Sequence, residues 1–176
     1  MIFPQRKLHR LKSWDYSQTG YYFITVCTYQ KQPLLSRLQI SNGDAAVRPT
    51  AIGQIVLDCW EKMNTVSPYV KTDAFCLMPN HLHGIIIIDK PEDVAVPSLS
   101  QLVRGFKSTA TRLYNSQSPP EKKNKLWQSS FYDEIIRNEE MLHDIRKYIL
   151  GNPSKWLDDP MYIEPSRNAE DSVPYV

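Results

Sequence analysis

The sequence predicts an α+β fold in which helices cover an antiparallel sheet, and three observations support this prediction. Segments rich in β-branched and aromatic residues alternate with segments whose apolar residues recur every three or four positions. The 176 residues, 41% of them hydrophobic and 23% charged, suit one globular domain with its own core. The purely apolar runs, such as Ile85–Ile88, are far too short to span a bilayer, so we expect no transmembrane helix.

The first predicted strand and the first predicted helix lie before residue 67. Gly20–Tyr29 is β-branched and aromatic, a composition typical of a strand. Pro33–Pro49 is irregular and contains a turn signal at Ser41-Asn42-Gly43, so no strand or helix is assigned to it. Ala51–Val66 has apolar residues at spacings of three and four, which predicts an amphipathic helix.

Two strands and a second helix are predicted in the middle of the chain. Tyr69–Met78 indicates a second strand, which ends at Pro79-Asn80. His81–Ile88 indicates a third strand, and its apolar end implies burial on both faces and a central position in the sheet. Ser98–Tyr114 places its apolar residues on one face, which predicts a second amphipathic helix.

A fourth strand and a third helix complete the pattern. The strand is predicted around Phe131–Ile136, and the helix over Glu139–Leu150 is ended by a glycine and a proline. Beyond Trp156 the chain has three prolines and no strong periodicity, so we expect an extended or partly ordered segment. The order of the first six elements is that of the ferredoxin-like βαββαβ fold, with two helices on one face of the sheet. The additional C-terminal helix is free to cover the other face.

Charge is unevenly distributed along the chain, although its net value is only +2. Residues 157–176 carry five acids and one base, a net of −4, so the remaining residues hold a net of +6. We therefore divide the chain into a single domain at 1–156, which opens with a basic arm at 1–19, and an acidic tail at 157–176. A basic body with an acidic tail is compatible with a polyanionic partner and also with an ordinary solvated surface.

The sequence favours a cytoplasmic location. Its three cysteines, Cys27, Cys59 and Cys76, form no CxxC pair and no even-numbered disulfide set, which indicates a reducing compartment. The first residues lead into polar sequence without the apolar core of a secretion signal.

A histidine pair is the first candidate for chemistry. In a strand, residues i and i+2 point to the same face, so His81 and His83 project together while Leu82 points to the opposite side. Two neutral imidazoles on one face provide half of a divalent-metal site and leave most of the coordination shell unfilled. The alternative is a pair of hydrogen-bonded histidines at a strand edge.

Tyr148 and Asn152 are the second candidate. They are four residues apart at the end of the third helix and therefore share a face. An Asn152 side-chain oxygen at the helix terminus could turn toward a cation, with Tyr148 one turn away. The alternatives are an aromatic anchor for Tyr148 and a C-cap in a left-handed conformation for Asn152.

These candidates belong to a longer series of motifs. In chain order the series is Gly20-Tyr21-Tyr22-Phe23-Ile24-Thr25, Met78-Pro79-Asn80-His81-Leu82-His83-Gly84, Phe106-Lys107-Ser108, Trp127-Gln128, Tyr132-Asp133-Glu134-Ile135-Ile136-Arg137, and Tyr148-Ile149 with Asn152-Pro153. Through this series, over about residues 20 to 157, the chain resembles the single-tyrosine HUH transposases (HUH meaning His, hydrophobic, His). The resemblance is strongest to the REP-associated tyrosine transposases. Members of this family are ferredoxin-like, in agreement with the order of elements above.

The resemblance implies a transposase-like enzyme that nicks and rejoins single DNA strands. Tyr148 would be the nucleophile, giving a 5′-phosphotyrosine link and a free 3′-hydroxyl. His81 and His83 would hold a divalent cation, Mg²⁺ or Mn²⁺, with Asn152 as a third ligand. The wider family usually has Gln at that helical position, and Asn resembles the REP-associated branch. The family includes both a monomer and a homodimer that exchanges the tyrosine helix.

The implied partner is single-stranded or hairpin DNA, processed in transposition or recombination. The bases available to bind it are Arg6, Lys7, Arg10 and Lys12 in the arm, Arg104 and Lys107 on the second helix, and Arg137 before the third. Trp127 and Tyr132 are expected to pack in the core or against the sheet. The acidic tail after Trp156 could occupy the DNA groove and restrain activity.

Two other functions fit the same residues. One is a non-catalytic module on the same fold that binds single-stranded or hairpin nucleic acid. The other is a metal-dependent phosphoesterase in which His81 and His83 activate water and Tyr148 only orients the substrate. A covalent protein–DNA adduct distinguishes the transposase from both.

Overall fold

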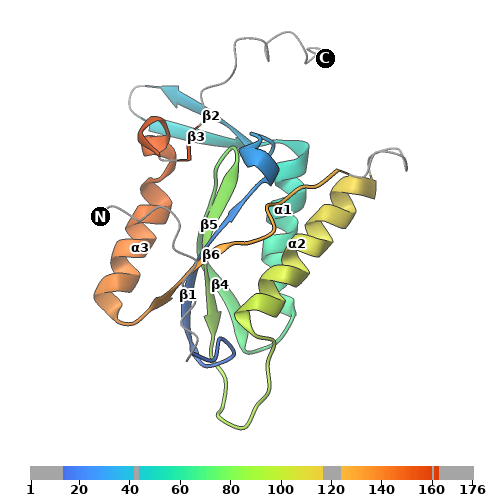
Figure 1. Ribbon diagram of the computed structural model, residues 1–176. Helices are drawn as coiled ribbons and strands as arrows, with labels where there is room; N and C mark the ends of the chain where they lie inside the picture. Colours follow the sequence, from blue (N-terminus) through green and yellow to red (C-terminus); the bar gives the residue numbers. More distant parts are fainter. Residues whose placement is uncertain (1–13, 42–43, 117–123, 160, 163–176) are drawn as a thin grey trace.

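The computed structural model describes residues 14–41, 44–116, 124–159 and 161–162. A four-stranded sheet with the order β4-β5-β1-β6 forms its centre (Figure 1). Its strands are β1 (Gly20–Cys27), β4 (Val70–Leu77), β5 (His81–Ile88) and β6 (Tyr132–Ile136). Its helices are α1 (Ala51–Lys62), α2 (Leu99–Ser116) and α3 (Glu139–Gly151). None of the helices in the described ranges is long and apolar enough to cross a membrane.

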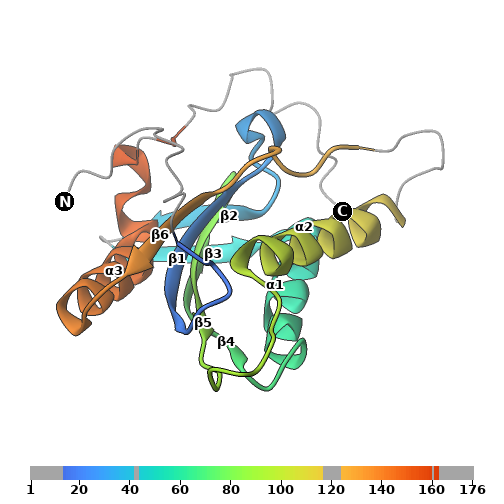
Figure 2. The same cartoon turned by 60° about the horizontal axis from the view of Figure 1, so that its bottom comes forward.

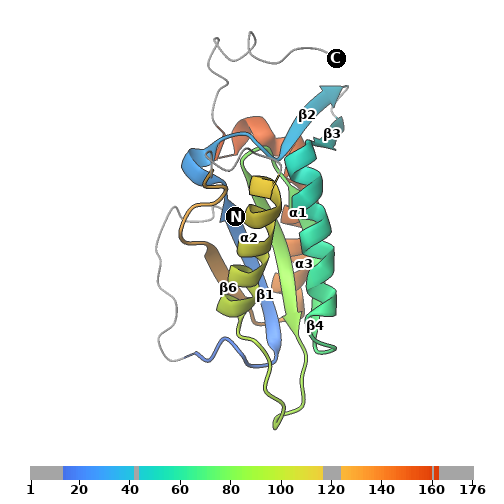
Figure 3. The ribbon, with the colours of Figure 1, turned by 90° about the vertical axis from the view of Figure 1, so that its right-hand side faces the viewer.

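The topology confirms the predicted ferredoxin-like fold. β5 pairs antiparallel with both β1 and β4, so β1 and β4 run parallel with β5 inserted between them, as in a split βαβ unit. β6 pairs antiparallel with the other edge of β1. The helices α1 and α2 cover one face of the sheet, and α3 covers the other (Figures 2 and 3). The central position predicted for the third strand is also confirmed.

A β-hairpin lies where the sequence was read as irregular. β2 (Ser36–Ser41) pairs antiparallel with β3 (Asp44–Pro49) as a separate two-stranded sheet. The predicted turn, Ser41-Asn42-Gly43, falls where β2 ends and before β3 begins, but Asn42 and Gly43 lie outside the described residues. The strands themselves were not predicted, although Leu38 and Ile40 of β2 alternate with polar residues, because β3 has no such alternation.

Strand alternation divides the interior into two cores. On one face of the sheet, Tyr22, Ile24 and Leu82 pack with residues of α1 and α2. On the other face, Phe23 and Ile85 pack with residues of α3. The two cores bury β5 on both sides, which explains why its side chains are nearly all inaccessible.

Gly84 is required by this packing. It lies on β5 opposite the indole of Trp60 from α1, and a Cβ atom at this position would collide with that ring. The glycine directly follows the histidine pair in the sequence. Close packing of α1 on the sheet therefore explains the glycine of the motif.

Caps and an ion pair fix α3 on the sheet. The Asn138 side-chain oxygen accepts a hydrogen bond from the Met141 backbone amide at 2.8 Å, which caps the helix. Arg146 contacts Asp73 of β4, with Nε and Nη2 at 2.7 and 2.6 Å from the same carboxylate oxygen. Asp73 lies where the β4–β5 register shifts between Thr72 and Phe75. The bulge thus turns an acid toward the helix that carries the predicted nucleophile.

The chain after α3 returns to the sheet. A 3₁₀ segment, Pro153–Asp158, buries Trp156 and is followed by Met161, whose backbone oxygen accepts a hydrogen bond from the Asn80 amide at 2.9 Å. Tyr162 then packs edge-on against Trp156. The start of the predicted tail, as far as residue 162, is therefore packed against the domain. Residues 163–176 lie outside the described residues, and the predicted division at 156 stays a prediction.

Candidate active site

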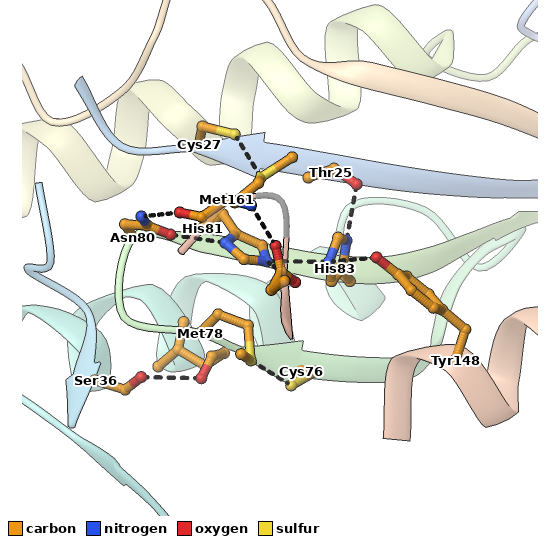
Figure 4. Close-up of polar contacts among 12 residues, drawn as sticks. Thr25, Cys27, Ser36, Cys76, Met78, Asn80, His81, His83, Tyr148 and Met161 are labelled. Carbon is orange, nitrogen blue, oxygen red and sulfur yellow. Dashed lines mark hydrogen bonds and ion pairs between the residues drawn. The ribbon is translucent and has the colours of Figure 1, made fainter. Parts of the chain in front are cut away.

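The two histidines project together from β5 toward α3, as the strand pattern predicted. His81 and His83 are 0% and 2% exposed, and their Nε2 atoms lie 3.0 Å apart (Figure 4). Leu82 between them points into the opposite core. The backbone alternation of a single strand is therefore sufficient to create the pair.

Each imidazole is oriented by a hydrogen bond at its other nitrogen. The Asn80 amide oxygen lies 2.8 Å from His81 Nδ1, so this nitrogen carries the proton and His81 Nε2 has a free lone pair. The Thr25 hydroxyl lies 2.8 Å from His83 Nδ1 and can either donate or accept. In the second case the Nε2 lone pairs of both rings converge on the same point. Such outer hydrogen bonds are the usual way in which proteins orient metal-binding imidazoles.

Burial keeps both imidazoles neutral. It lowers the pKa of His83 to about 3. The pKa of His81 is also well below its usual value, because of burial first, then of repulsion between the two rings if both were protonated, and then of the charge of Lys31. A cation therefore need not displace a proton from either ring at neutral pH.

Asp159 completes a group of three metal-ligand candidates. Its Oδ2 lies 3.9 Å from His81 Nε2, and ligand atoms of His81, His83 and Asp159 all lie within 4.8 Å of one another. Burial raises the carboxyl pKa, while hydrogen bonds from the Met161 backbone and the Asn152 side chain and the charge of Lys31 oppose this change. Two imidazoles and one carboxylate form a ligand set used for divalent cations in proteins.

Asp159 is not among the site residues that the sequence predicted. In the sequence it is one of the acids of the tail, separated from the histidines by more than seventy residues. No local spacing connects it to them, because the return of the chain after α3 brings it to the site.

Tyr148 reaches the histidine pair from α3. Its hydroxyl lies 3.4 Å from His83 Nε2, and its ring meets the His83 ring at a centroid distance of 5.2 Å (Figure 4). Burial, and after it the charge of Asp159, raises the pKa of Tyr148 to about 12, against a hydrogen bond from the Asn152 side chain. The phenol is therefore protonated at neutral pH in this arrangement and needs a base or a cation to become a nucleophile.

Asn152 lies beside Tyr148 and Asp159, as its interactions with both groups indicate. It is 4% exposed, and its Oδ1 is buried without a hydrogen-bond partner among the described residues. An unsatisfied buried oxygen is costly, and a cation at the histidine pair is the kind of partner that would satisfy it. Asn152 is the C-cap residue of α3, as the alternative predicted, but the left-handed conformation is wrong, because Asn152 has φ −61° and ψ −42° and continues into the 3₁₀ segment.

A strained loop lies next to the site. Gln30 and Lys31 follow β1 with φ of 53° and 55°, in the left-handed region that non-glycine residues seldom adopt. Hydrogen bonds from Thr28 to the Asn80 and Gln32 carbonyls tie this loop to the turn before His81. The loop brings a cation, Lys31, whose charge acts on both His81 and Asp159. Lys31 has no sequence signal that would have pointed to this position.

The predicted DNA-binding bases do not gather at the histidine pair. Arg104 is exposed on α2, across the sheet from the site, and Arg137 is exposed just before α3. Lys107 instead donates from Nζ to the backbone oxygens of Gln128, Ser129 and Ser130 at 2.6, 3.1 and 3.4 Å. The four arm residues lie outside the described residues; they are Arg6, Lys7, Arg10 and Lys12. Trp127 is buried, as predicted, and Tyr132 is half-buried against Phe23.

Comparison with known proteins agrees with this geometry. Residues 52–152, more than half of the chain, match the family described as "Transposase IS200 like" (Y1_Tnp). The chain belongs to the IS200-like transposase family. The matched segment extends from α1 through α3 and contains both histidines, Tyr148 and Asn152.

Individual relatives support the family assignment. A Haemophilus influenzae protein described as uncharacterized is 32% identical over 179 aligned positions, covering 90% of this chain and 94% of the relative. A second protein of that organism, assigned as a REP-associated tyrosine transposase, is 25% identical over 88 positions, 48% of this chain and 50% of the relative. A solved REP-associated tyrosine transposase bound to a REP hairpin has a TM-score of 0.60 at 22% identity, over 86% of this chain and 74% of that one. The resemblance to REP-associated transposases and the shared fold are thereby confirmed.

Proposed function

We propose that this IS200-like transposase nicks and rejoins single DNA strands through Tyr148. The observation that carries the proposal is the convergence of the Tyr148 hydroxyl, at 3.4 Å from His83 Nε2, with a buried pair of neutral imidazoles. A tyrosine that only anchored α3 would not need to direct its hydroxyl at this pair. The approach therefore supports the nucleophile that the motif series implied.

A divalent cation, Mg²⁺ or Mn²⁺, fits the residues gathered here. His81, His83 and Asp159 would hold it, and the unpartnered Oδ1 of Asn152 is a further oxygen donor within the same cluster. When bound, it would supply positive charge to a nonbridging phosphate oxygen and to the developing negative charge. Because imidazole is an unusual ligand for Mg²⁺, the two histidines favour Mn²⁺ in vitro.

The chemical step assigned to the chain's own residues is a transesterification. The Tyr148 oxygen forms a bond to phosphorus as the bond between phosphorus and O3′ breaks, and the released oxygen takes up a proton to become a 3′-hydroxyl. The phenolic proton must pass to a base, since burial holds the phenol in its protonated form. Attack of a 3′-hydroxyl on the 5′-phosphotyrosine link reverses the step and rejoins DNA without ATP.

One chain is proposed to supply the whole site. Tyr148 comes from a helix that packs on its own sheet through a shared core and through the Arg146–Asp73 ion pair. This packing favours a monomeric enzyme over an exchange of the tyrosine helix between two subunits. The three cysteines are free thiols, which is compatible with the proposed cytoplasmic location.

The proposed substrate is single-stranded or hairpin DNA. The structural relative was solved with a REP hairpin bound, and repeat hairpins are therefore the first substrates to test. A strand rather than a closed duplex is required because the scissile phosphate must reach atoms buried between β5 and α3.

The test is the formation of a covalent adduct on a labelled hairpin oligonucleotide in the presence of Mn²⁺. We expect a protein band that carries the 5′ end of the downstream fragment in the wild type and no such band in Tyr148→Phe. Tyr69→Phe, at a half-buried position preceding β4, is the matched control and should form the adduct. Cleavage without an adduct would favour the phosphoesterase, and binding without cleavage would favour the non-catalytic module.

A further inference from the structure

A groove separate from the histidine site lies between α2 and residues 124–131. Its volume is about 890 Å³, at the upper end of the usual range for ligand pockets. α2 forms one wall, and the extended segment before β6 forms the other. The groove therefore has two built walls and is not a flat patch of surface.

The lining of the groove is cationic. Arg104, Lys107, Arg112 and Lys125 line it, and none of the described residues in its lining is acidic. Arg104 and Arg112 are eight residues apart on α2, which places them on the same side of the helix with a rise of about 12 Å between them. Ser108 lies between them and adds a hydroxyl to the same stripe. The spacing suits an extended anion better than a single small one.

Hydrogen bonds hold the second wall in place. The three contacts from Lys107 to backbone oxygens bind residues 128–130 to α2. Lys125 places its Nζ 4.7 Å from the centre of the Tyr29 ring, a cation–π contact that orients its charge. Lys107 thus builds the groove, while Arg104, Arg112 and Lys125 are exposed and available to a ligand.

One residue of the groove wall carries a buried donor without a partner among the described residues. Trp127 lines the groove, is 4% exposed, and its Nε1 has no hydrogen-bond partner among the described residues. A buried indole N–H normally finds an acceptor, and phosphate and sugar oxygens are acceptors. The exposed cations of the groove, Arg104, Arg112 and Lys125, favour the same class of ligand.

The groove is connected to the active site through β1. Thr28 forms a bridge with Trp127, and the Gln128 amide donates to the Cys27 carbonyl at 3.0 Å. Cys27 is the register partner of His81 on β5. One wall of the groove is thus attached to the end of the strand beside the histidine pair, at the edge of the sheet that β6 leaves uncovered.

We propose that this groove binds the sugar–phosphate backbone of the DNA strand outside the cleavage site, an inference that rests on the proposed function for the identity of the ligand. Arg104, Arg112 and Lys125 contact phosphates, and Lys107 holds the wall that carries Lys125 and Trp127. A strand bound here passes over the end of β1 to reach the histidine site. Backbone contacts of this kind position DNA without reading its sequence.

The test measures the salt dependence of DNA binding. Arg112→Gln with Lys125→Gln is made in a Tyr148→Phe background, so that cleavage does not affect the binding signal, and binding to a labelled hairpin with a single-stranded extension is followed by fluorescence anisotropy. Loss of two phosphate contacts should reduce the slope of log K against log salt concentration by about 1.4 for a single strand. We expect affinity at low salt to fall at least tenfold.

The matched control is Lys62→Gln with Lys71→Gln in the same background. Both lysines are exposed and lie outside the groove lining. The control variant therefore removes the same amount of positive charge without changing the groove. The proposal is overturned if the groove variant (Arg112→Gln with Lys125→Gln) binds DNA with the affinity and salt slope of Tyr148→Phe alone. It is also overturned if the control variant loses as much affinity as the groove variant.

The outcome also separates this proposal from the proposed function. If the wild type forms no adduct but the groove variant loses affinity, the groove proposal stands and the proposed nicking activity is refuted. If the wild type forms an adduct but the groove variant binds unchanged, the nicking activity stands and the groove proposal is refuted.

Discussion

Replacing Asp159 with asparagine tests whether this carboxylate belongs to the metal centre. The substitution keeps the shape of the side chain and one oxygen. In the wild type the Met161 backbone amide donates a hydrogen bond to Asp159 Oδ1 at 2.6 Å, and the asparagine oxygen can still accept it. It removes only the negative charge. Asp158→Asn is the matched control, because Asp158 precedes it in the chain and is exposed.

The expected effect follows from the geometry. Asp159 Oδ2 is 3.9 Å from His81 Nε2, so a dication held by His81 lies within about 4 Å of the carboxylate. A charge of +2 and a charge of −1 at that distance interact by about 2 kcal/mol with the dielectric constant of water, and by more in a buried site. Each 1.4 kcal/mol corresponds to a factor of ten, so Mn²⁺ should bind about 30-fold more weakly to Asp159→Asn.

Calorimetric titration with Mn²⁺ at neutral pH measures this change directly. Thermal unfolding provides a second readout, since a ligand at 100 times its dissociation constant stabilises the folded state by about 2.7 kcal/mol. An affinity of Asp159→Asn within threefold of the wild type would refute the reasoning, and so would an equal loss in Asp158→Asn. In the first case Asp159 would only pack beside the histidines.

Three further predictions concern stability. Arg146→Gln should destabilise the fold by about 1 kcal/mol, because a partly exposed ion pair contributes no more than this. It should also lower the adduct yield, because the ion pair holds the helix that carries Tyr148. Lys147→Gln, exposed on the same helix, is the control for both measurements. Because the pKa of His83 is lowered from 6.5 to about 3, the unfolded chain binds more protons between these values, so this residue alone should cost the metal-free protein about 3 kcal/mol between pH 7 and pH 4 in urea titrations, and the lowered pKa of His81 should add to the loss. His83→Gln should reduce the slope, and an equally steep curve in this variant would contradict the assignment. Gln30→Gly should raise the midpoint of thermal unfolding by relieving a left-handed φ of 53°, with a gain of about 0.5 to 1 kcal/mol, and an unchanged or lower midpoint would show that the loop is not strained.

Local patterns predicted the parts of the site that belong to one element. The spacing of His81 and His83 determines that both rings face the same way on any strand, and β5 confirms it. Tyr148 and Asn152 lie four residues apart in the chain, and the structure brings both side chains next to Asp159. The left-handed conformation suggested for Asn152 was wrong because a following proline permits a 3₁₀ continuation as well as a C-cap.

Charge alone did not predict which cations are free to contact a ligand. Lys107 was predicted to bind DNA from its position on a helix, but its ammonium is used by three backbone carbonyls that no sequence pattern reveals. Arg112 and Lys125 carried no special signal and now line a groove. Whether a lysine or arginine is available to a ligand depends on which hydrogen-bond acceptors the packing of the chain brings next to it.

By itself the sequence determined the order of the helices and of the strands of the main sheet, the ferredoxin-like topology and the shared face of the histidine pair, but not the β2–β3 hairpin. These follow from periodicity and composition, which act over a few neighbouring residues. Only the tertiary structure decided that α3 lies over this pair, that Asp159 joins it, and that α2 and residues 124–131 enclose a cationic groove. These long-range contacts depend on how separate elements pack around two cores and on where the chain returns after its last helix. Local sequence patterns do not predict either of these.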